Sequence, residues 1–257
     1  MATEKPARPI HKGVYILPNL FTTASLFAGF LGLLWASAGQ YEQCALAILF
    51  SALMDGLDGK VARLTNTASE FGVQYDSLCD LVAFGVVPAF LVWHWQLEPF
   101  GRLGIGAAFL LAACGALRLA RFNISTATAC KKFFTGLPIP AAGCALSCFV
   151  LFAPYVPDFF MGIMPYFTLL LTIMLALLMV SRVRYASFKE YGFIKAHPFS
   201  SMVSVILLFA LIASEPKIFG FLLFMAYLIS GLVYTFIILP RRTRKLLASP
   251  AQQGDLS

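Results

Sequence analysis

The sequence has very little charge for its length. Only 12% of its 257 residues are charged, whereas 60% are hydrophobic. Soluble domains normally carry about 25% charged residues, so this composition excludes an ordinary soluble protein. No stretch is polar enough over a sufficient length to form a separate soluble domain, and no internal repeat is evident. The sequence therefore predicts one all-α domain, residues 1–257, that is a polytopic membrane helix bundle.

The chain also lacks the cysteine and histidine patterns of metal or disulfide scaffolds. It contains six cysteines and three histidines but no Cys-x-x-Cys pair, and most of its cysteines lie inside apolar segments. Cysteines placed in this way behave as small core residues, which excludes a disulfide framework and a zinc site. The basic N-terminal segment leads into an apolar run without a clear small-residue cleavage site, so we expect that run to be retained.

Long apolar runs are what the sequence does have. A helix needs about 20 mostly apolar residues to cross a bilayer. Eight segments meet this requirement approximately, namely 16–37, 42–63, 76–97, 101–122, 138–154, 160–181, 198–214 and 217–239. We expect about eight transmembrane helices, six of them forming a core within 16–181 and two more lying within 198–239.

Lysine and arginine alternate between successive connections. Seventeen of the nineteen basic residues fall on one side of the expected membrane, and only Arg102 and Lys217 fall on the other. Cytoplasmic loops retain positive charge. We therefore expect a multi-pass protein of the inner, cytoplasmic membrane of the cell, with both the N-terminal segment 1–13 and the tail 240–257 in the cytoplasm. Because the basic residues are dispersed over loops, the net charge of +7 indicates contact with lipid headgroups and not with nucleic acid.

Four aspartates interrupt two of the apolar helices, within the stretch MDGLDGKVARLTNTASEFGVQYDSLCD. Asp55 and Asp58 are three residues apart, and Asp76 and Asp80 are four residues apart, so each pair shares one face of its helix. The two helices are adjacent and antiparallel in the expected topology. We therefore expect the four carboxylates to converge near the cytoplasmic side.

Four convergent carboxylates require compensating positive charge. Oxygen ligands suit Mg²⁺ or Mn²⁺, and four carboxylates suffice for a site with two ions that clamps phosphoryl oxygens. Two alternatives stay open. The aspartates could form interhelical salt bridges with Lys60 and Arg63, although two bases cannot balance four acids. The chain could also be a cation transporter with a carboxylate site inside the membrane.

Small and polar residues accompany the aspartates. Gly59, Ala62 and Gly72 lie within a helical turn of them, where a nucleotide or diphosphate could approach the backbone, although small residues also serve helix packing. Asn19 and Thr22 share one side of the first apolar segment near its start, where they could cap the helix or contact a ligand.

Together these residues spell D-x-x-D-G-x-x-A-R-x8-G-x-x-x-D-x-x-x-D, from Asp55 to Asp80. This pattern resembles the signature of the CDP-alcohol phosphotransferase family, integral membrane enzymes that move a phosphatidyl or similar group from a CDP-linked lipid to an alcohol. The resemblance implies that Asp55, Asp58 and Asp76 bind two divalent cations, and that Asp80 lies near a metal and acts as the general base. It also implies nucleotide contacts, which we assign to Asn19, Thr22, Asp58, Gly59, Ala62, Arg63 and Gly72.

Further blocks narrow the resemblance. LPNLFTTASLFAGFLGLL, YDSLCDLVAFGVVPA, RLARFN and FFTGLPIPAA are similar to family members that use L-serine as the acceptor. The implied substrates are CDP-diacylglycerol and L-serine, with CMP released by in-line displacement as Asp80 takes the proton from the serine hydroxyl. Another acceptor, such as glycerol phosphate, inositol or choline, stays open. The family resemblance also implies a homodimer.

An acceptor that carries a carboxylate needs a cationic partner. Arg118 and Arg121, three residues apart at the inner end of the fourth segment, could bind a carboxylate or a lipid phosphate through two parallel hydrogen bonds. Both could equally be anchors at the positive side of the membrane. Asn123, Thr135 and Gly136 in the following loop are further candidates for this pocket.

Overall fold

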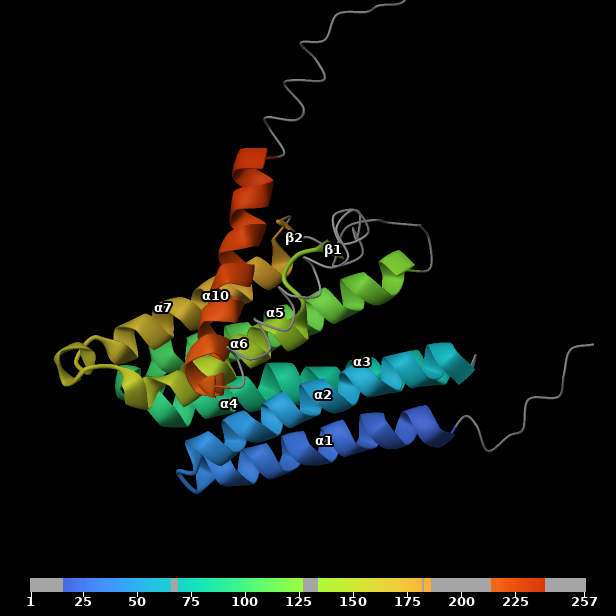
Figure 1. The fold of residues 1–257 in the computed structure, drawn as a ribbon, viewed down its shortest axis with the longest axis horizontal. Helices are drawn as coiled ribbons and strands as arrows, with labels where there is room; N and C mark the ends of the chain where they lie inside the picture. Colours follow the sequence, from blue (N-terminus) through green and yellow to red (C-terminus); the bar gives the residue numbers. More distant parts are fainter. Residues whose placement is uncertain (1–15, 66–68, 127–133, 182, 186–213, 239–257) are drawn as a thin grey trace, which may run out of the picture.

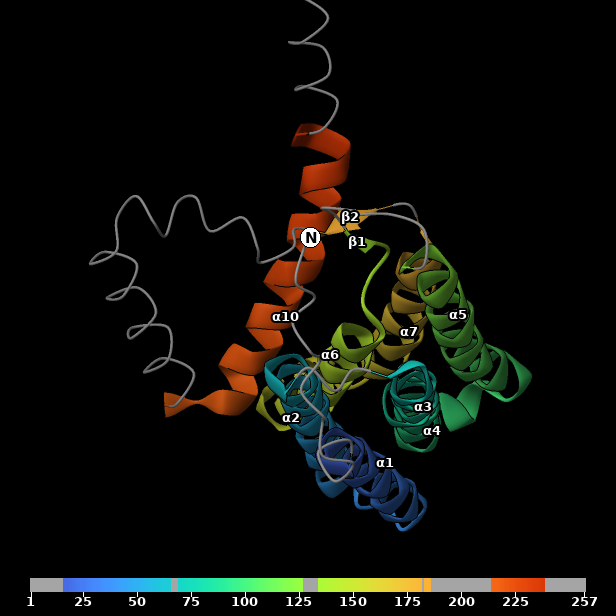
Figure 2. The ribbon, with the colours of Figure 1, turned by 90° about the vertical axis from the view of Figure 1, so that its right-hand side faces the viewer.

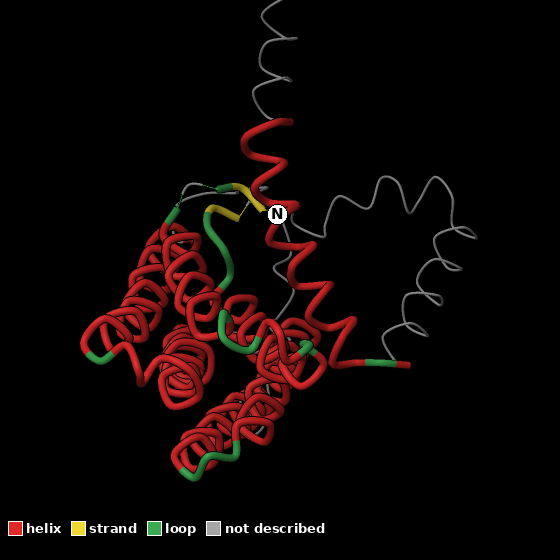
Figure 3. The backbone as a smooth tube through the Cα atoms, turned by 90° about the vertical axis from the view of Figure 1, so that its left-hand side faces the viewer, coloured by secondary structure: helices red, strands yellow, loops and turns green. Residues whose placement is uncertain are grey.

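The computed structural model describes residues 16–65, 69–126, 134–181, 183–185 and 214–238. Within these residues the chain is a bundle of helices with a single short strand pair, which Figure 3 shows in yellow. The helices are α1 (Ile16–Ser37), α2 (Tyr41–Thr65), α3 (Glu70–Asp80), α4 (Val87–Val92), α5 (Arg102–Thr126), α6 (Ile139–Phe152), α7 (Met164–Val180) and α10 (Pro216–Val233). Strands β1 (Phe134–Thr135) and β2 (Arg184–Tyr185) pair antiparallel. Apart from that pair, the described residues confirm the all-α prediction (Figure 1).

Helices α3 and α4 belong to one long helical run, Glu70–Phe100, which is 31 residues long. The π-helical segment η2 (Leu81–Val86) joins α3 to α4, and a second π-helical segment, η3 (Trp93–Leu97), leads into a short 3₁₀ turn, Glu98–Phe100. The run is therefore longer at both ends than the predicted span 76–97. Segments of π-helix occur frequently at functional sites, and η2 begins immediately after Asp80.

Four described helical runs are long and apolar enough to cross a bilayer, namely Pro18–Ser37, Glu70–Phe100, Arg102–Ile124 and Pro216–Phe236. The apolar helices Ile139–Tyr155 and Met164–Val180 are shorter. Helix α2 has 25 residues, but its second half carries the charged signature residues. The length and apolar composition of these helices support the prediction of a membrane protein. Eight spans and cytoplasmic termini stay predictions, because 198–213 and both termini lie outside the described residues.

Helices α1 and α2 pack closely along their length. Gly39, with φ of +76°, makes the turn between them. Ser25 and Ser51 exchange hydrogen bonds, each hydroxyl donating to the other residue's carbonyl oxygen at 3.2 and 2.9 Å. At Gly32 a Cβ would lie 3.5 Å from the Cys44 sulfur, so the two helices meet through small residues as is common in membranes. This packing fixes the α1 side chains relative to the α2 aspartates.

The core lies around η2 and the helices that cover it. Phe84 of η2 is fully buried. Gly143 of α6 approaches it so closely that an added Cβ would lie 3.1 Å from the Phe84 Cα, and at Gly85 of η2 an added Cβ would lie 3.8 Å from the Cα of Ala112 in α5. Close backbone approach of this kind restricts movement, so the segment that follows Asp80 is held by α5 and α6. The five described cysteines are buried and free, as predicted, namely Cys44, Cys79, Cys114, Cys144 and Cys148.

Helix α10 leaves the bundle steeply, as Figure 2 shows. Its contact with α6 is aromatic, because the Phe221 ring stacks on Phe152 at 4.9 Å and lies 5.4 Å from Phe149. Much of its remaining apolar surface is exposed, including Leu222 and Ile229. The aspartate-bearing helices therefore belong to the closely packed part of the fold, and α10 is attached to one side of it.

Candidate active site

Three of the four predicted aspartates meet in one cluster between α2 and α3. Asp55, Asp76 and Asp80 each direct one carboxylate oxygen to a point where these atoms lie within 4.8 Å of one another. Asp55 comes from the second half of α2, and the other two come from α3. The helical spacing thus brings acids from two helices to one place, as the sequence predicts.

Asp58 lies beside this cluster and is oriented by α1. It is buried, and its Oδ2 accepts a hydrogen bond of 2.6 Å from the hydroxyl of Thr22, which is also buried. Asp58 interacts electrostatically with Asp55 and Asp76. The structure therefore places the fourth acid next to the other three, with one of its oxygens engaged by Thr22.

No lysine or arginine among the described residues forms an ion pair with these aspartates. Among all the residues that the structure describes, the one ion pair joins Lys217 to Glu42. Lys60 and Arg63 are both exposed. The described residues thus do not support interhelical salt bridges as the reason for the aspartates. The Oδ1 atom of Asp76 is buried without a hydrogen-bond partner, a costly state for a polar atom. A cluster of carboxylate oxygens with an unsatisfied buried member fits a divalent cation such as Mg²⁺ or Mn²⁺.

The predicted nucleotide residues lie on α1, α2 and the start of α3. Gly59 leaves open space on α2, since the nearest atom to an added Cβ would be a guanidinium nitrogen of Arg63 at 3.9 Å. Gly72 lies opposite α1, because its Cβ would be 3.6 Å from Oδ1 of Asn19. Ala62 is half-buried on the same helix as Gly59. The structure thus places Thr22 against Asp58 and Gly72 against Asn19, and it leaves Arg63 exposed.

Sequence reasoning missed a polar contact between α1 and α3. The Tyr75 hydroxyl and the Thr23 hydroxyl are 2.9 Å apart, within hydrogen-bond distance. Helix α3 begins at Glu70, and the preceding Ser69 is its N-cap, whose Oγ accepts from the Gly72 amide at 3.0 Å. Tyr75 directly precedes Asp76, and a lone tyrosine beside a signature acid is a signal that could have drawn attention to it.

The residues predicted for the acceptor pocket have different surroundings in the structure. Arg118 of α5 is half-buried and interacts electrostatically with Asp80, and its Nε is buried without a hydrogen-bond partner. Arg121 is exposed. Asn123 donates to the Ser77 hydroxyl at 3.0 Å and to Gln74 Oε1 at 3.4 Å, so it ties α5 to α3. Of these three residues, Arg118 is the one whose positive charge interacts with an aspartate of the cluster.

Thr135 is the last residue of strand β1, and Gly136 follows it. Gly136 has φ of +83°, and an added Cβ would lie 2.3 Å from the Met179 carbonyl oxygen. Its amide donates to the Val183 carbonyl at 2.8 Å. Backbone geometry therefore accounts for this glycine without a ligand. Thr135 pairs with Arg184 in the strand register, and its side chain lies outside the described residues.

Comparison with known proteins identifies relatives of this chain. A 43% identical relative over 178 residues, 69% of this chain and 74% of its own, is the CDP-diacylglycerol–serine O-phosphatidyltransferase of Helicobacter pylori. The archaetidylserine synthase of Methanothermobacter thermautotrophicus is 35% identical over 66% of this chain and 69% of its own. A CDP-diacylglycerol–serine O-phosphatidyltransferase of Methanocaldococcus jannaschii is 33% identical over 75% and 85%. The family model for CDP-alcohol phosphatidyltransferase matches residues 15–237, and the chain therefore belongs to that family.

Proposed function

We propose that this protein transfers the phosphatidyl group of CDP-diacylglycerol to the hydroxyl of L-serine and releases CMP. The observation that carries the proposal is the meeting of Asp55, Asp76 and Asp80 within 4.8 Å, in a chain whose relatives are named for this reaction. The family favours a transferase over a cation transporter, and it accounts for the spacing of the glycines as well as that of the acids.

The aspartates would hold one or two divalent cations, and we favour two. Asp55, Asp76 and Asp80 would be direct ligands, and Asp58 would contribute its oxygen that faces away from Thr22. Mg²⁺ or Mn²⁺ supplies positive charge that neutralises the diphosphate when bound. Asn19, Gly59 and Gly72 border the same region, where the cytidine and diphosphate would be bound against open helix backbone.

Asp80 is the residue that we assign as the general base. Its carboxylate accepts the proton of the serine hydroxyl while the serine oxygen forms a bond to the β-phosphorus of the CDP-lipid. The bond between that phosphorus and the oxygen that bridges it to CMP breaks, and CMP leaves with the electron pair. Cys79 is the thiol next to Asp80 in the sequence, but it is buried, and buried structural cysteines are unreactive. We therefore propose direct displacement without a covalent enzyme intermediate.

Arg118 is the residue that we assign to the serine carboxylate. Its half-buried guanidinium has an unsatisfied Nε and acts on Asp80 electrostatically. A guanidinium can bind a carboxylate through two parallel hydrogen bonds. Serine would then lie with its carboxylate on Arg118 and its hydroxyl on Asp80. Choline and inositol have no anionic group for this arginine, which favours serine over both.

We further propose that the protein lies in the cytoplasmic membrane with this site facing the cytoplasm. Asp55 and Asp58 lie in the second half of α2, which also carries Lys60 and Arg63, and Arg118 and Arg121 lie in the last third of α5. Basic residues favour the cytoplasmic side. Assembly as a homodimer rests on the family resemblance alone.

The acceptor assay tests the proposal. The purified full chain is incubated with CDP-diacylglycerol and Mg²⁺ or Mn²⁺, and CMP release is measured with L-serine, glycerol phosphate, inositol and choline in turn. We expect release that depends on serine and on the metal. Release with a different alcohol alone would contradict the acceptor assignment. Ion flux in proteoliposomes without any CMP release would instead favour the transporter.

A further inference from the structure

A cavity lies at the end of the bundle opposite the aspartates. It has a volume of about 380 Å³ and is formed by the start of α2, the end of α6 and the π-helical segment η3. Its lining includes Tyr41, Glu42, Trp95, Leu151 and Pro154. The aspartates lie in the other half of α2, so this cavity belongs to neither the nucleotide nor the acceptor region.

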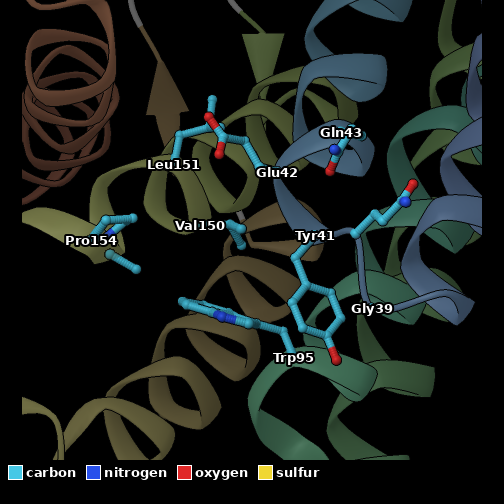
Figure 4. A pocket seen from close by; sticks show the side chains of 10 residues that line it. Gly39, Tyr41, Glu42, Gln43, Trp95, Val150, Leu151 and Pro154 are labelled. Atoms are coloured by element: carbon cyan, nitrogen blue, oxygen red, sulfur yellow. The ribbon is translucent and has the colours of Figure 1, made fainter.

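Two aromatic rings and one carboxylate shape this cavity. In Figure 4 the Trp95 indole lies on one side, Tyr41 stands next to it, and the Glu42 carboxylate lies across the opening from the indole. The Tyr41 hydroxyl donates to the His94 carbonyl at 2.9 Å. The Trp95 ring packs edge-on against Phe149 at 5.5 Å. Both rings are therefore fixed before any ligand arrives.

An aromatic face opposite a carboxylate suits an ammonium group. The ring quadrupole attracts a cation within about 6 Å of its centre, and tryptophan is the best of the aromatic residues for this purpose. The carboxylate of Glu42 adds a negative charge, which Lys217 of α10 balances. These paired charges match a headgroup that carries both an ammonium and a phosphate, whereas an anionic headgroup offers no cation to the indole and Glu42.

Helix α10 supplies a positive charge next to the cavity. Lys217 forms an ion pair with Glu42, and the side chains of both residues are partly exposed, at 34% and 54%. A ligand with an ammonium and a phosphate could bring the ammonium to Glu42 and the phosphate to Lys217. Leu151 and Pro154 add an apolar side to the cavity, which suits the glycerol and first acyl carbons of a lipid.

We propose that this cavity binds the headgroup of an ammonium-bearing phospholipid. It lies where α1 passes into α2 and where α6 ends, and the ends of membrane helices are expected at the headgroup region. Tryptophan and tyrosine gather at such borders, where headgroups are found. The occupant is therefore a lipid of the surrounding leaflet and not a substrate of the aspartate site.

The test compares lipids on the purified full chain in detergent. Short-chain phosphatidylethanolamine, phosphatidylcholine and phosphatidylglycerol are titrated separately, with free phosphoethanolamine as a fourth ligand, and bound lipid is counted by native mass spectrometry. We expect both ammonium lipids to bind about tenfold more tightly than phosphatidylglycerol. If phosphatidylglycerol bound as tightly as the ammonium lipids, the proposal would be wrong. If free phosphoethanolamine bound as tightly as phosphatidylethanolamine, the ligand would not need to be a lipid, which would also contradict the proposal.

Variants separate this role from a purely structural one. Glu42→Gln should remove the preference for ammonium lipids. Lys217→Gln breaks the same ion pair but leaves the carboxylate free, so it should keep or strengthen ammonium preference. If the pair served only to hold α10, the two variants would change binding equally, which would contradict the proposal. Glu98→Gln, an exposed acid of the 3₁₀ turn that follows η3, is the matched control and should leave lipid preference unchanged.

Discussion

The acidic residues at the two ends of the helix bundle differ in whether they have a basic partner within the chain. At one end Glu42 is paired with Lys217 across α2 and α10. At the other end, Asp55, Asp76 and Asp80 converge without an ion pair to any lysine or arginine among the described residues, and Asp76 Oδ1 has no hydrogen-bond partner. An unpaired acid in apolar surroundings is costly. The contrast indicates that the aspartates are completed by a ligand from outside the chain, whereas Glu42 has a partner within it.

Asp80→Asn is expected to have the largest effect on the aspartate end of the bundle. The change removes the base but keeps the size of the side chain, so serine-dependent CMP release should fall by about 10²–10⁴-fold. Binding of the CDP-lipid, measured by equilibrium dialysis, should remain appreciable. Glu70→Gln, an exposed acid in the first turn of the same helix, is the matched control and should keep its activity. A near-normal rate in the Asp80 variant would show that the base has been assigned to the wrong residue.

Asp55→Asn should produce a smaller and different loss. Removing one carboxylate from the cluster weakens the hold on a divalent cation, so the Mg²⁺ concentration needed for half-maximal nucleotide binding should rise by about 10–100-fold. Asp58→Asn should also weaken metal-dependent binding. Isothermal titration with CDP at several Mg²⁺ concentrations measures both variants. Binding of CDP that is unchanged at low Mg²⁺ in both variants would contradict the assignment of the cluster as a metal site.

Thr22→Val and Thr23→Val compare two neighbouring hydroxyls of α1. Thr22 donates to Asp58, whereas Thr23 meets Tyr75 on the exposed side of the same helix. Freeing the Asp58 carboxylate should weaken nucleotide binding by about tenfold, because groups that orient ligands matter nearly as much as the ligands. Thr23→Val should change it much less. Isothermal titration with CDP measures both variants. An equal loss of CDP affinity in the two variants would contradict the assignment of Thr22 to the nucleotide site.

Arg118→Lys and Arg121→Lys test the acceptor pocket. Lysine keeps the charge but loses the paired hydrogen bonds of a guanidinium. The KM for serine should rise about tenfold in the Arg118 variant with the KM for the CDP-lipid unchanged, since a charge-assisted hydrogen bond is lost. Arg121 is exposed, and its variant should behave like wild type. Equal serine KM values for both variants would indicate that neither arginine contacts the acceptor.

The sequence predicted the aspartate cluster well because helical periodicity is a local property. Spacings of three and four residues placed Asp55 and Asp58 on one face and Asp76 and Asp80 on another, and the short link between α2 and α3 left few ways to arrange the helices. Thr22 was also identified from its spacing to Asn19. Its bond to Asp58 could not be predicted, since that bond depends on how α1 packs against α2.

The parts that sequence reasoning did not foresee depend on tertiary packing. Arg118 and Arg121 are equivalent in the sequence, and only the position of α5 beside η2 turns one toward Asp80. Gly136 looked like a ligand residue, but its positive φ and its approach to Met179 explain it. The π-helical segment after Asp80 has no simple sequence signal. The pairing of Lys217 with Glu42 joins residues that are far apart in the chain and required the placement of α10.

The smallest expected effect concerns that pair and completes the comparison between the two ends. An exposed ion pair contributes about 0.5 kcal/mol, so Lys217→Gln should lower the free energy of unfolding, measured by denaturant titration in mixed micelles, by no more than roughly this amount. Serine-dependent CMP release should stay at the wild-type level, because Lys217 lies at the end of the bundle away from the aspartates. A large loss of transferase activity would mean that α10 transmits its position to the aspartate cluster through α6. In that case the two ends would have to be treated as one coupled unit.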